Sequence, residues 1–402
     1  MASLPYILVC AGEDSGDVIG EPLVCALRSR NVVVEGAGGR RMQTAGMIPL
    51  VDFGLLPVSG FGDVLPRYLK LRRSYNVLKS ALESSECLGL IAIDYPGFNM
   101  KLVERAGELR KPALYVAPPQ VWAWKRKRAK VLARNSYVKL AVFFDFEERV
   151  YADAGCNVVR VMHPFANSEL GIRSSELYFE RHETLHGIAE TEAVPSPRCL
   201  LLPGSRKAQA LRNLSLMLKA VQMTRKSLEI SRMEITLLAA RWELVEVFEN
   251  ALRQFGDDDL IRKVHVVESP QEADARRAIY QEASLALTAP GTATLELALS
   301  GCPMIVCVKP DALTYGFARV FVKTKYFALP NIILNKLVYP EKICAPGKEQ
   351  CTVASIAQEI AFESISKQNP DTDVLYSKLS AGMSLDQLAT EFLRQFVEGK
   401  AE

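Results

Sequence analysis

The sequence lacks the patterns that mark zinc-binding and disulfide-bonded proteins. Its nine cysteines are scattered over 402 residues without a C-x-x-C pair or a regular spacing, and only four histidines are present. Structural zinc sites need closely spaced Cys and His ligands, and disulfide frameworks are recognised by cysteines at characteristic spacings. The sequence therefore indicates neither kind of site, and it favours a reducing compartment.

Long apolar runs and a strong charge excess are also absent. No apolar run approaches the roughly 20 residues that cross a bilayer, so we expect any membrane association to be peripheral. The first apolar run, Leu4–Cys10, has no basic region before it and no cleavage signal after it, which predicts a strand rather than a signal peptide. The net charge of +3 is too small to indicate a nucleic-acid partner.

The charges that are present are unevenly distributed. Residues 1–170 hold 22 Lys and Arg against 17 Asp and Glu, a net of +5, whereas the remainder holds 27 against 29, a net of −2. The first half is therefore expected to face a phosphorylated substrate or an anionic membrane. Two basic clusters stand out there: Arg67, Lys70, Arg72 and Arg73, and the run from Lys125 to Lys130.

Short apolar strands alternate with helical patterns along most of the chain. Strands are expected at 6–10, 32–35, 88–93, 113–116, 140–144, 158–161, 199–202, 235–239, 264–267, 285–288 and 304–308. This alternation predicts an α/β protein with two doubly wound parallel-sheet domains that face each other across a cleft. The expected parts are a domain over 1–167, a linker over 168–198, a domain over 199–350, and helices over 351–402 that could return to the first domain.

Two glycine-containing segments of the first half need separate comment. Ala11–Asp17 reads as a turn, with a helix expected over 18–27. Gly36-Ala37-Gly38-Gly39 is not the G-x-G-x-x-G fingerprint and shows no helix start after it, which argues against a dinucleotide dehydrogenase.

The stretch from Ala283 to Glu296 predicts a phosphate site. A buried strand is followed by the glycine turn at Gly291 and by a helix start near Thr294. Such a turn presents backbone N–H groups to an anion, and Glu296, one turn into the helix, could accept both hydroxyls of a ribose. The alternative is that Thr292 caps the helix and Glu296 only favours the helix dipole.

A second turn of this kind follows the strand at 199–202. In Leu202-Pro203-Gly204-Ser205-Arg206 a small-residue turn exposes the backbone, and Arg206 adds a forked cation. With Gly291–Thr294 it could hold a diphosphate from two sides, and Arg206 would stabilise the charge of a departing nucleotide. The alternative for Arg206 is an ordinary surface ion pair.

In the first half, Asp94 directly follows an apolar strand, in Asp94-Tyr95-Pro96-Gly97-Phe98-Asn99. A partly desolvated carboxylate at that edge could take a proton from an attacking hydroxyl, although an aspartate before Pro-Gly is also a common cap. His163 ends another expected strand, and we expect it to be structural.

Aromatic and apolar residues adjoin both basic clusters. Trp122 and Trp124 directly precede the run that begins at Lys125, and an apolar segment, Leu55–Phe61, precedes the cluster around Lys70. Solvated helix faces, with the apolar segment in the core, are one interpretation. Contact with phosphates or with a lipid surface is the second. Nucleic acid ranks third for the run from Lys125, because no base-stacking fold is visible.

Taken together, these motifs resemble the lipid-A-disaccharide synthases, a bacterial family of inverting glycosyltransferases with the two-domain B-type fold. The resemblance runs from Gly12 to about Glu341. The motifs that carry it are Gly12–Asp17, Asp94–Asn99, Gln120–Trp124, Phe146-Glu147, His163-Pro164, Leu202–Arg206, Gly291–Glu296 and Leu329–Asn331.

The resemblance implies transfer of 2,3-diacylglucosamine from its UDP donor to 2,3-diacylglucosamine 1-phosphate, with no metal or other cofactor and no nucleic-acid partner. Asp94 would be the general base, assisted by Arg206. The donor would contact Gly204, Ser205, Arg206, Gly291, Thr292, Ala293, Thr294, Glu296 and Asn331. The acceptor would contact Gly12, Ser15, Gly16, Asp17, Asn99, Gln120 and Trp122. The acyl chains would enter near Phe61, with the enzyme at the cytoplasmic surface of the inner membrane.

The sequence departs from the family pattern at Met162, Asn167, Gln209 and Pro290, and again after Glu341. These positions commonly hold glycine, aspartate, glutamate and serine in the family. Two alternatives follow: a relative that binds a UDP-sugar or lipid without catalysis, or another B-type enzyme such as a UDP-N-acetylglucosamine epimerase.

Overall fold

The computed structural model describes residues 4–56, 64–122, 127–166, 198–224, 233–321, 324–363 and 372–398. The chain divides into two compact units. Unit 1 combines Met1–Ser168 with Lys378–Glu402, and unit 2 is Glu169–Ser377.

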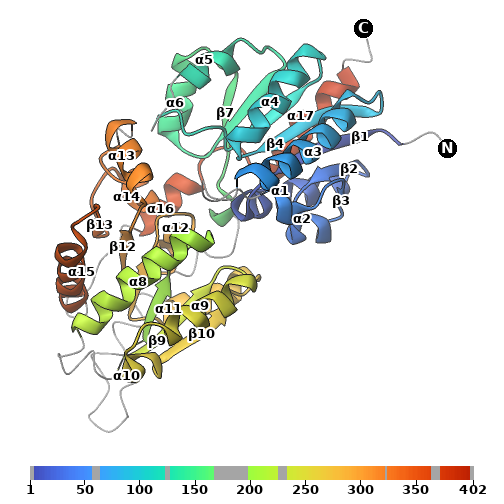
Figure 1. The fold of residues 1–402 in the computed structure, drawn as a ribbon. Coiled ribbons are helices and arrows are strands. Elements are labelled where there is room, and N and C mark those ends of the chain that lie inside the picture. Colours follow the sequence, from blue (N-terminus) through green and yellow to red (C-terminus); the bar gives the residue numbers. More distant parts are fainter. Residues whose placement is uncertain are drawn as a thin grey trace. The chain divides into compact units, whose positions relative to one another are not determined.

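Unit 1 is built on a seven-stranded parallel sheet in the order β3-β2-β1-β4-β5-β6-β7 (Figure 1). Its strands are β1 (Tyr6–Ala11), β2 (Val33–Ala37), β3 (Ile48–Pro49), β4 (Cys87–Ile93), β5 (Ala113–Val116), β6 (Val138–Val142) and β7 (Val158–Arg160). Every residue of β1 is buried. Because successive side chains of a strand point to opposite faces, helices must cover both faces of the sheet.

The helices of unit 1 connect these strands. They are α1 (Asp14–Arg28), α2 (Arg40–Thr44), α3 (Val64–Glu83), α4 (Pro96–Glu108), α5 (Lys127–Ala133), α6 (Asp145–Asp153) and the short 3-10 helices η1 (Phe53–Leu55) and η2 (Pro164–Ala166). The last helix, α17 (Leu385–Glu398), also belongs to unit 1, where it packs against α1.

Unit 2 has a six-stranded parallel sheet in the order β10-β9-β8-β11-β12-β13. Its strands are β8 (Arg198–Leu202), β9 (Glu234–Ala239), β10 (Val264–Glu268), β11 (Leu285–Thr288), β12 (Met304–Val308) and β13 (Glu341–Ile343). Its helices are α8 (Lys207–Thr224), α9 (Glu243–Arg253), α10 (Asp258–Ile261), α11 (Ala273–Glu282), α12 (Ala293–Leu299), α13 (Ala312–Phe321), α14 (Leu329–Leu334) and α15 (Glu349–Glu363). The remaining helix, α16 (Thr372–Leu379), runs across the boundary between the units.

The prediction of an α/β fold with two parallel sheets is confirmed. Its details need correction. The segment Asp14–Asp17 is the first turn of α1 and not part of a preceding turn, and α2 begins directly after Gly39, where no helix was expected. The strand expected at 140–144 is β6, two residues earlier, and β3 and β13 are too short to leave a periodic signal.

The C-terminal helices do not form one group. α15 packs along α8 within unit 2, whereas α17 completes unit 1. Of the expected linker over 168–198, only Arg198 lies among the described residues.

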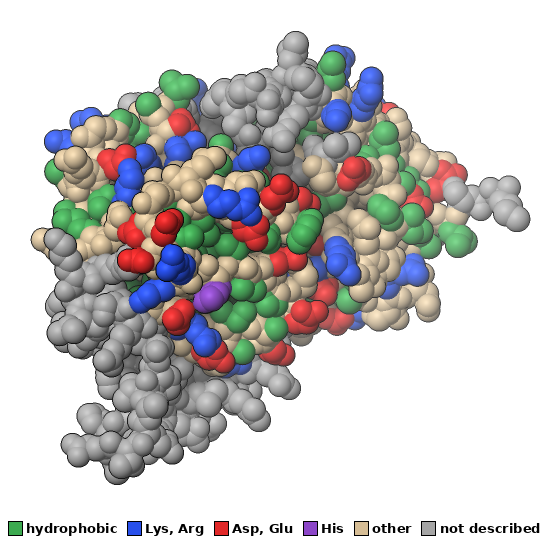
Figure 2. All heavy atoms as spheres, turned by 60° about the horizontal axis from the view of Figure 1, so that its bottom comes forward, with side chains coloured by type: hydrophobic (Ala, Val, Ile, Leu, Met, Phe, Trp, Pro, Cys, Tyr) green, Lys and Arg blue, Asp and Glu red, His purple; other side chains and the backbone are tan. Residues whose placement is uncertain are grey.

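Acidic and basic side chains are interspersed on the face drawn in Figure 2, which agrees with the small net charge. In the described part of the chain, no helix is both long and apolar enough to cross a membrane.

Candidate active site

In each unit, the strand order reverses at one position. In unit 1 the chain moves outward through β1, β2 and β3 and then returns to add β4 beside β1; in unit 2 it does the same with β8 and β11. Ligands of doubly wound sheets bind at such switch points, beyond the carboxyl ends of the strands. Most of the predicted site residues follow these four strands.

The two glycine turns of unit 2 meet at its switch point. Leu202, the last residue of β8, pairs with Thr288, the last residue of β11. The N–H of Ala289 donates to the carbonyl of Leu202 at 2.8 Å, and a Cβ added to Gly204 would lie 3.6 Å from the Cβ of Ala289, so the two turns begin side by side. Gly204 has a φ of 111°, which side-chain-bearing residues rarely adopt. The predicted approach of the two turns is therefore present.

Two buried or half-buried side chains support the first of these turns. Asn213, with no exposed surface, donates to the carbonyl of Pro203 at 2.9 Å and accepts from the N–H of Lys309 at 2.8 Å. Arg241 donates to the carbonyl of Ser205 at 3.0 Å. Arg206 itself is exposed at the start of α8.

The second turn presents backbone N–H groups. Among the described residues, those of Gly291, Thr292 and Ala293 have no hydrogen-bond partner. Gly291 is exposed, and an added Cβ there would meet nothing within 4 Å. Thr292 occupies the N-cap position of α12, as the alternative interpretation expects, but its side chain makes no cap hydrogen bond. Thr294 is buried and donates to the carbonyl of Gly291 at 2.7 Å, which fixes the turn.

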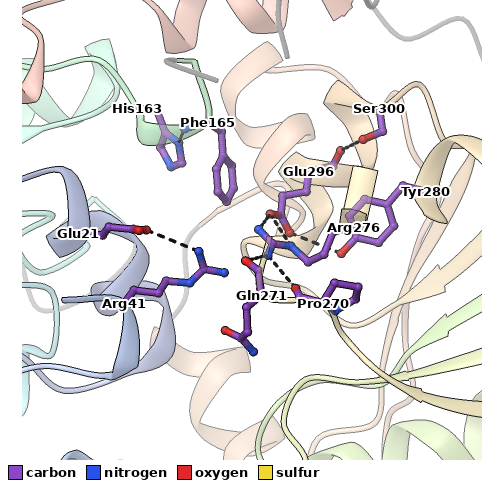
Figure 3. Close-up of polar contacts among 10 residues, drawn as sticks. All are labelled: Glu21, Arg41, His163, Phe165, Pro270, Gln271, Arg276, Tyr280, Glu296 and Ser300. Carbon is purple, nitrogen blue, oxygen red and sulfur yellow. Dashed lines mark hydrogen bonds and ion pairs between the residues drawn. The ribbon is translucent and has the colours of Figure 1, made fainter. Parts of the chain in front are cut away.

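Glu296 is held by two residues of α11 (Figure 3). The Arg276 guanidinium donates to its Oε1 from Nη2 at 2.6 Å and from Nε at 3.1 Å. The Tyr280 hydroxyl lies 3.5 Å from its Oε2. Neither α11 residue was predicted, since an arginine and a tyrosine on a helix give no sequence signal of such a role.

Asn331 lies in a different setting from the one predicted. It is fully buried on α14, where its side chain donates to Glu341 and to the carbonyl of Tyr339 and accepts from the N–H groups of Val338 and Tyr339. These four bonds use the whole capacity of an amide side chain. Asn331 can therefore shape the site through the loop it holds, but its amide has no capacity left for a nucleotide.

At the switch point of unit 1, Gly12 and Asp94 emerge side by side. They follow Ala11 of β1 and Ile93 of β4, which pair with each other. Position 12 requires glycine because the Tyr95 ring lies against its backbone: an added Cβ would lie 2.2 Å from that ring. Asp94 and Tyr95 both have left-handed backbones, with φ of 47° and 49°.

The strained backbone at Asp94 is held by hydrogen bonds. Its N–H donates to the carbonyl of Val116 at 2.9 Å, and its carbonyl accepts from Asn99 at 2.9 Å and from the Tyr115 hydroxyl at 3.1 Å. Asn99 is fully buried and also reaches the carbonyls of Cys10 and Ile93. Asn99 thus joins the ends of β1 and β4 and positions Asp94.

The loop after β5 carries Gln120 and Trp122, and α6 fixes it. Gln120 is exposed, while the Trp122 indole donates to Glu147 at 3.1 Å and the Tyr151 hydroxyl donates to the carbonyl of Pro119 at 2.5 Å. Burial raises the pKa of Glu147 to about 7, and the charge of Asp94 adds to the rise. Glu147 was recognised as part of a family motif, but no role was predicted for it.

The start of α1 serves the structure of unit 1. Asp17 is buried, and its carboxylate accepts from the N–H groups of Arg41 and Met42 at 3.1 and 3.2 Å, which caps α2. This placement does not support direct sugar contact by Asp17. Gly16 is buried against Ala11, and Ser15 is half-buried.

His163 follows β7 and is buried among aromatic rings, as expected of a structural histidine. Burial lowers its pKa to about 3, so the ring is neutral. Its Nδ1 accepts from the N–H of Phe165 at 3.2 Å, which leaves the proton on Nε2.

Other predicted positions, Phe61, Lys125, Arg126 and Asn167, lie outside the described residues. The described residues contain no cluster of three or more His, Cys, Asp or Glu side chains able to hold a metal ion.

Solved structures with the same architecture define the class. A putative UDP-N-acetylglucosamine 2-epimerase from Listeria monocytogenes matches with a TM-score of 0.60 at 11% identity, covering 99% of this chain and 97% of that one. MurG from Acinetobacter baumannii matches with a TM-score of 0.53 at 15% identity, covering 97% of this chain and 99% of that one. The fold is that of the B-type glycosyltransferases.

Sequence comparison then gives the family. A family model described as lipid-A-disaccharide synthetase matches residues 7–386. A lipid-A-disaccharide synthase from Syntrophus aciditrophicus is 32% identical over 355 residues, which cover 87% of each chain. The chain belongs to the lipid-A-disaccharide synthase family and is a glycosyltransferase. The predictions of family, fold and enzyme class are confirmed.

Proposed function

We propose that this protein transfers 2,3-diacylglucosamine from its UDP donor to the 6-hydroxyl of 2,3-diacylglucosamine 1-phosphate. The products are UDP and the β-1,6-linked disaccharide 1-phosphate. The observation that carries the proposal is that the turns after β8 and β11 begin side by side, with Glu296 in the helix that follows the second turn, in a chain that matches this family over residues 7–386.

The donor would bind to unit 2. Its diphosphate would accept hydrogen bonds from the N–H groups of Gly291 and Thr292 and from the Arg206 guanidinium, and its ribose hydroxyls would donate to Glu296. Charge-assisted bonds of this kind stabilise the negative charge that builds up on UDP as it leaves.

The acceptor would bind to unit 1, near Asp94 and Gln120. Asp94 takes the proton of the 6-hydroxyl as the hydroxyl oxygen attacks the anomeric carbon, and the bond from that carbon to the UDP oxygen breaks with inversion.

We also propose that the basic residues of α3 and α5, among them Lys70, Arg72 and Lys127, contact anionic lipid at the inner membrane.

The direct test gives purified protein both lipid substrates and identifies the product by mass spectrometry. Disaccharide 1-phosphate is the expected product. UDP binding without any transfer would instead favour the non-catalytic alternative, and conversion of soluble UDP-N-acetylglucosamine would favour an epimerase.

A further inference from the structure

Arg276 connects two parts of the carboxyl edge of the unit 2 sheet. From α11, its Nη1 donates to the carbonyls of Pro270 and Gln271 at 2.9 and 2.7 Å, in the loop that follows β10. Its Nε and Nη2 donate to Glu296 on α12. Figure 3 shows the guanidinium between these groups. The side chain is 9% exposed and that of Glu296 is 18% exposed.

The pairing with Glu296 is one-sided. Two N–H groups of Arg276 converge on Oε1, whereas arginine–carboxylate pairs frequently make two parallel bonds, one to each oxygen. In the described part of the chain Oε2 faces only the Tyr280 hydroxyl, at the long distance of 3.5 Å. Oε2 therefore keeps acceptor capacity for a ligand, and its orientation is fixed by the bonds to Oε1.

We propose that Arg276 is the positioning residue for ribose recognition: it holds Glu296 and the Pro270–Gln271 loop as one rigid surface that selects a nucleotide with a 2′-hydroxyl. The inference rests on the proposed binding of UDP to this site. Arg276 acts through Glu296 and touches no reacting atom. A lysine can replace it only in part, because one ammonium cannot reach both the carboxylate and the two carbonyls in the planar fork geometry.

Titration calorimetry with UDP and with 2′-deoxy-UDP tests this role. The wild-type protein is expected to bind UDP about tenfold more tightly than 2′-deoxy-UDP, the value of one hydrogen bond to a charged group. In Arg276→Met the preference should fall below about twofold, and in Arg276→Lys it should be intermediate. Arg253→Met is the matched control. Exposed Arg253 on α9 contacts Glu249 at 3.6 Å and Asn250 at 3.0 Å, both on its own helix. The preference of this variant should stay at the wild-type value.

A second comparison separates positioning from general stability. If Arg276 acts through Glu296, Arg276→Met combined with Glu296→Gln should bind UDP no more weakly than Glu296→Gln alone. If Arg276→Met and Arg276→Lys keep the wild-type preference for UDP, whether or not both affinities fall equally, the inference is overturned while the proposal of UDP binding stands. Failure of the wild-type chain to bind UDP would overturn the proposed function itself.

Discussion

At the residue scale, the backbone of Asp94 and Tyr95 stores strain. Two successive residues with positive φ are costly, by roughly 1–3 kcal/mol each. Hydrogen bonds from Asn99 and Tyr115 hold this backbone in place, and Gly12 leaves the space that the Tyr95 ring occupies. Strain of this kind concentrates where geometry matters for chemistry, which agrees with a catalytic role for Asp94.

A methyl group at position 12 should therefore disturb the site. In Gly12→Ala the Cβ would lie 2.2 Å from the Tyr95 ring, which must move and take Asp94 with it. A displacement of about 1 Å can reduce turnover by about a hundredfold. Steady-state assays should show this loss, while calorimetry should show unchanged UDP affinity; wild-type turnover in the variant would contradict the role given to Gly12.

Glu147 predicts a pH effect on stability. Its folded pKa of about 7 lies above the ordinary 4.5, so the folded state keeps the proton while the unfolded state loses it. The free energy of unfolding of the wild-type protein should therefore fall relative to that of Glu147→Gln as the pH rises from 4.5 to 7. The total fall should be on the order of 3 kcal/mol, and the difference between the two proteins should be constant above pH 8. Denaturation of both proteins across this range measures it, and a flat difference would show that Glu147 is ionised.

At the element scale, each glycine turn depends on the strand pair before it. Pro290 weakens the second turn, because proline has no N–H to offer a phosphate and the hydroxyl of the family's serine is missing. Pro290→Ser should bind UDP about three- to tenfold more tightly, as expected for one added hydrogen bond. Pro203→Ser in the neighbouring turn is the comparison. Unchanged affinity in Pro290→Ser would mean that the phosphate does not lie against this turn.

The elements that the sequence predicts best are buried strands. β1, β4 and β11 are continuous apolar runs with every or nearly every residue buried, so composition alone marks them. The start of α1 was missed because Asp14-Ser15-Gly16-Asp17 has the composition of a turn. Its Asp17 instead caps α2 from 24 positions away, a tertiary contact that no local pattern contains.

The candidate site shows the same limit of sequence-based prediction. The positions of Gly204, Gly291, Glu296 and Asp94 after buried strands could be predicted, because each strand is recognisable in the sequence. The bond between Arg276 and Glu296 could not, because it depends on α11 lying against α12, and this contact is set by packing in the folded chain.

In the whole molecule, the last segment of the chain, Lys378–Glu402, belongs to unit 1, where α17 packs against α1. Gly89 of β4 has no side chain, and an added Cβ would lie 2.9 Å from the Phe396 ring and 3.2 Å from the Phe392 ring of α17. Arg30, two residues beyond the end of α1, pairs with Asp386 at 2.8 Å. The exposed ion pair orients the helix, whereas the buried Phe392 ring and the half-buried Phe396 ring supply most of the stability.

Phe392→Ala should accordingly destabilise unit 1. Phe392 is 3% exposed, and loss of a buried phenyl ring costs about 3–5 kcal/mol. Hydrogen exchange should show faster exchange in β1 and β4 but not in β8 and β11, with Asp386→Asn as the mild control. Equal acceleration in both sheets would contradict the assignment of α17 to unit 1.

We propose Asp94 as the base of a glycosyl transfer to a lipid acceptor. The most direct measurement is acceptor-dependent UDP release by the wild-type protein and by Asp94→Asn, with chelator present. We predict release that requires the diacylglucosamine 1-phosphate, and a decrease of about 10²- to 10⁴-fold in the variant with UDP affinity unchanged. Release at the wild-type rate from Asp94→Asn, or no release from a wild-type protein that binds UDP, would contradict the account.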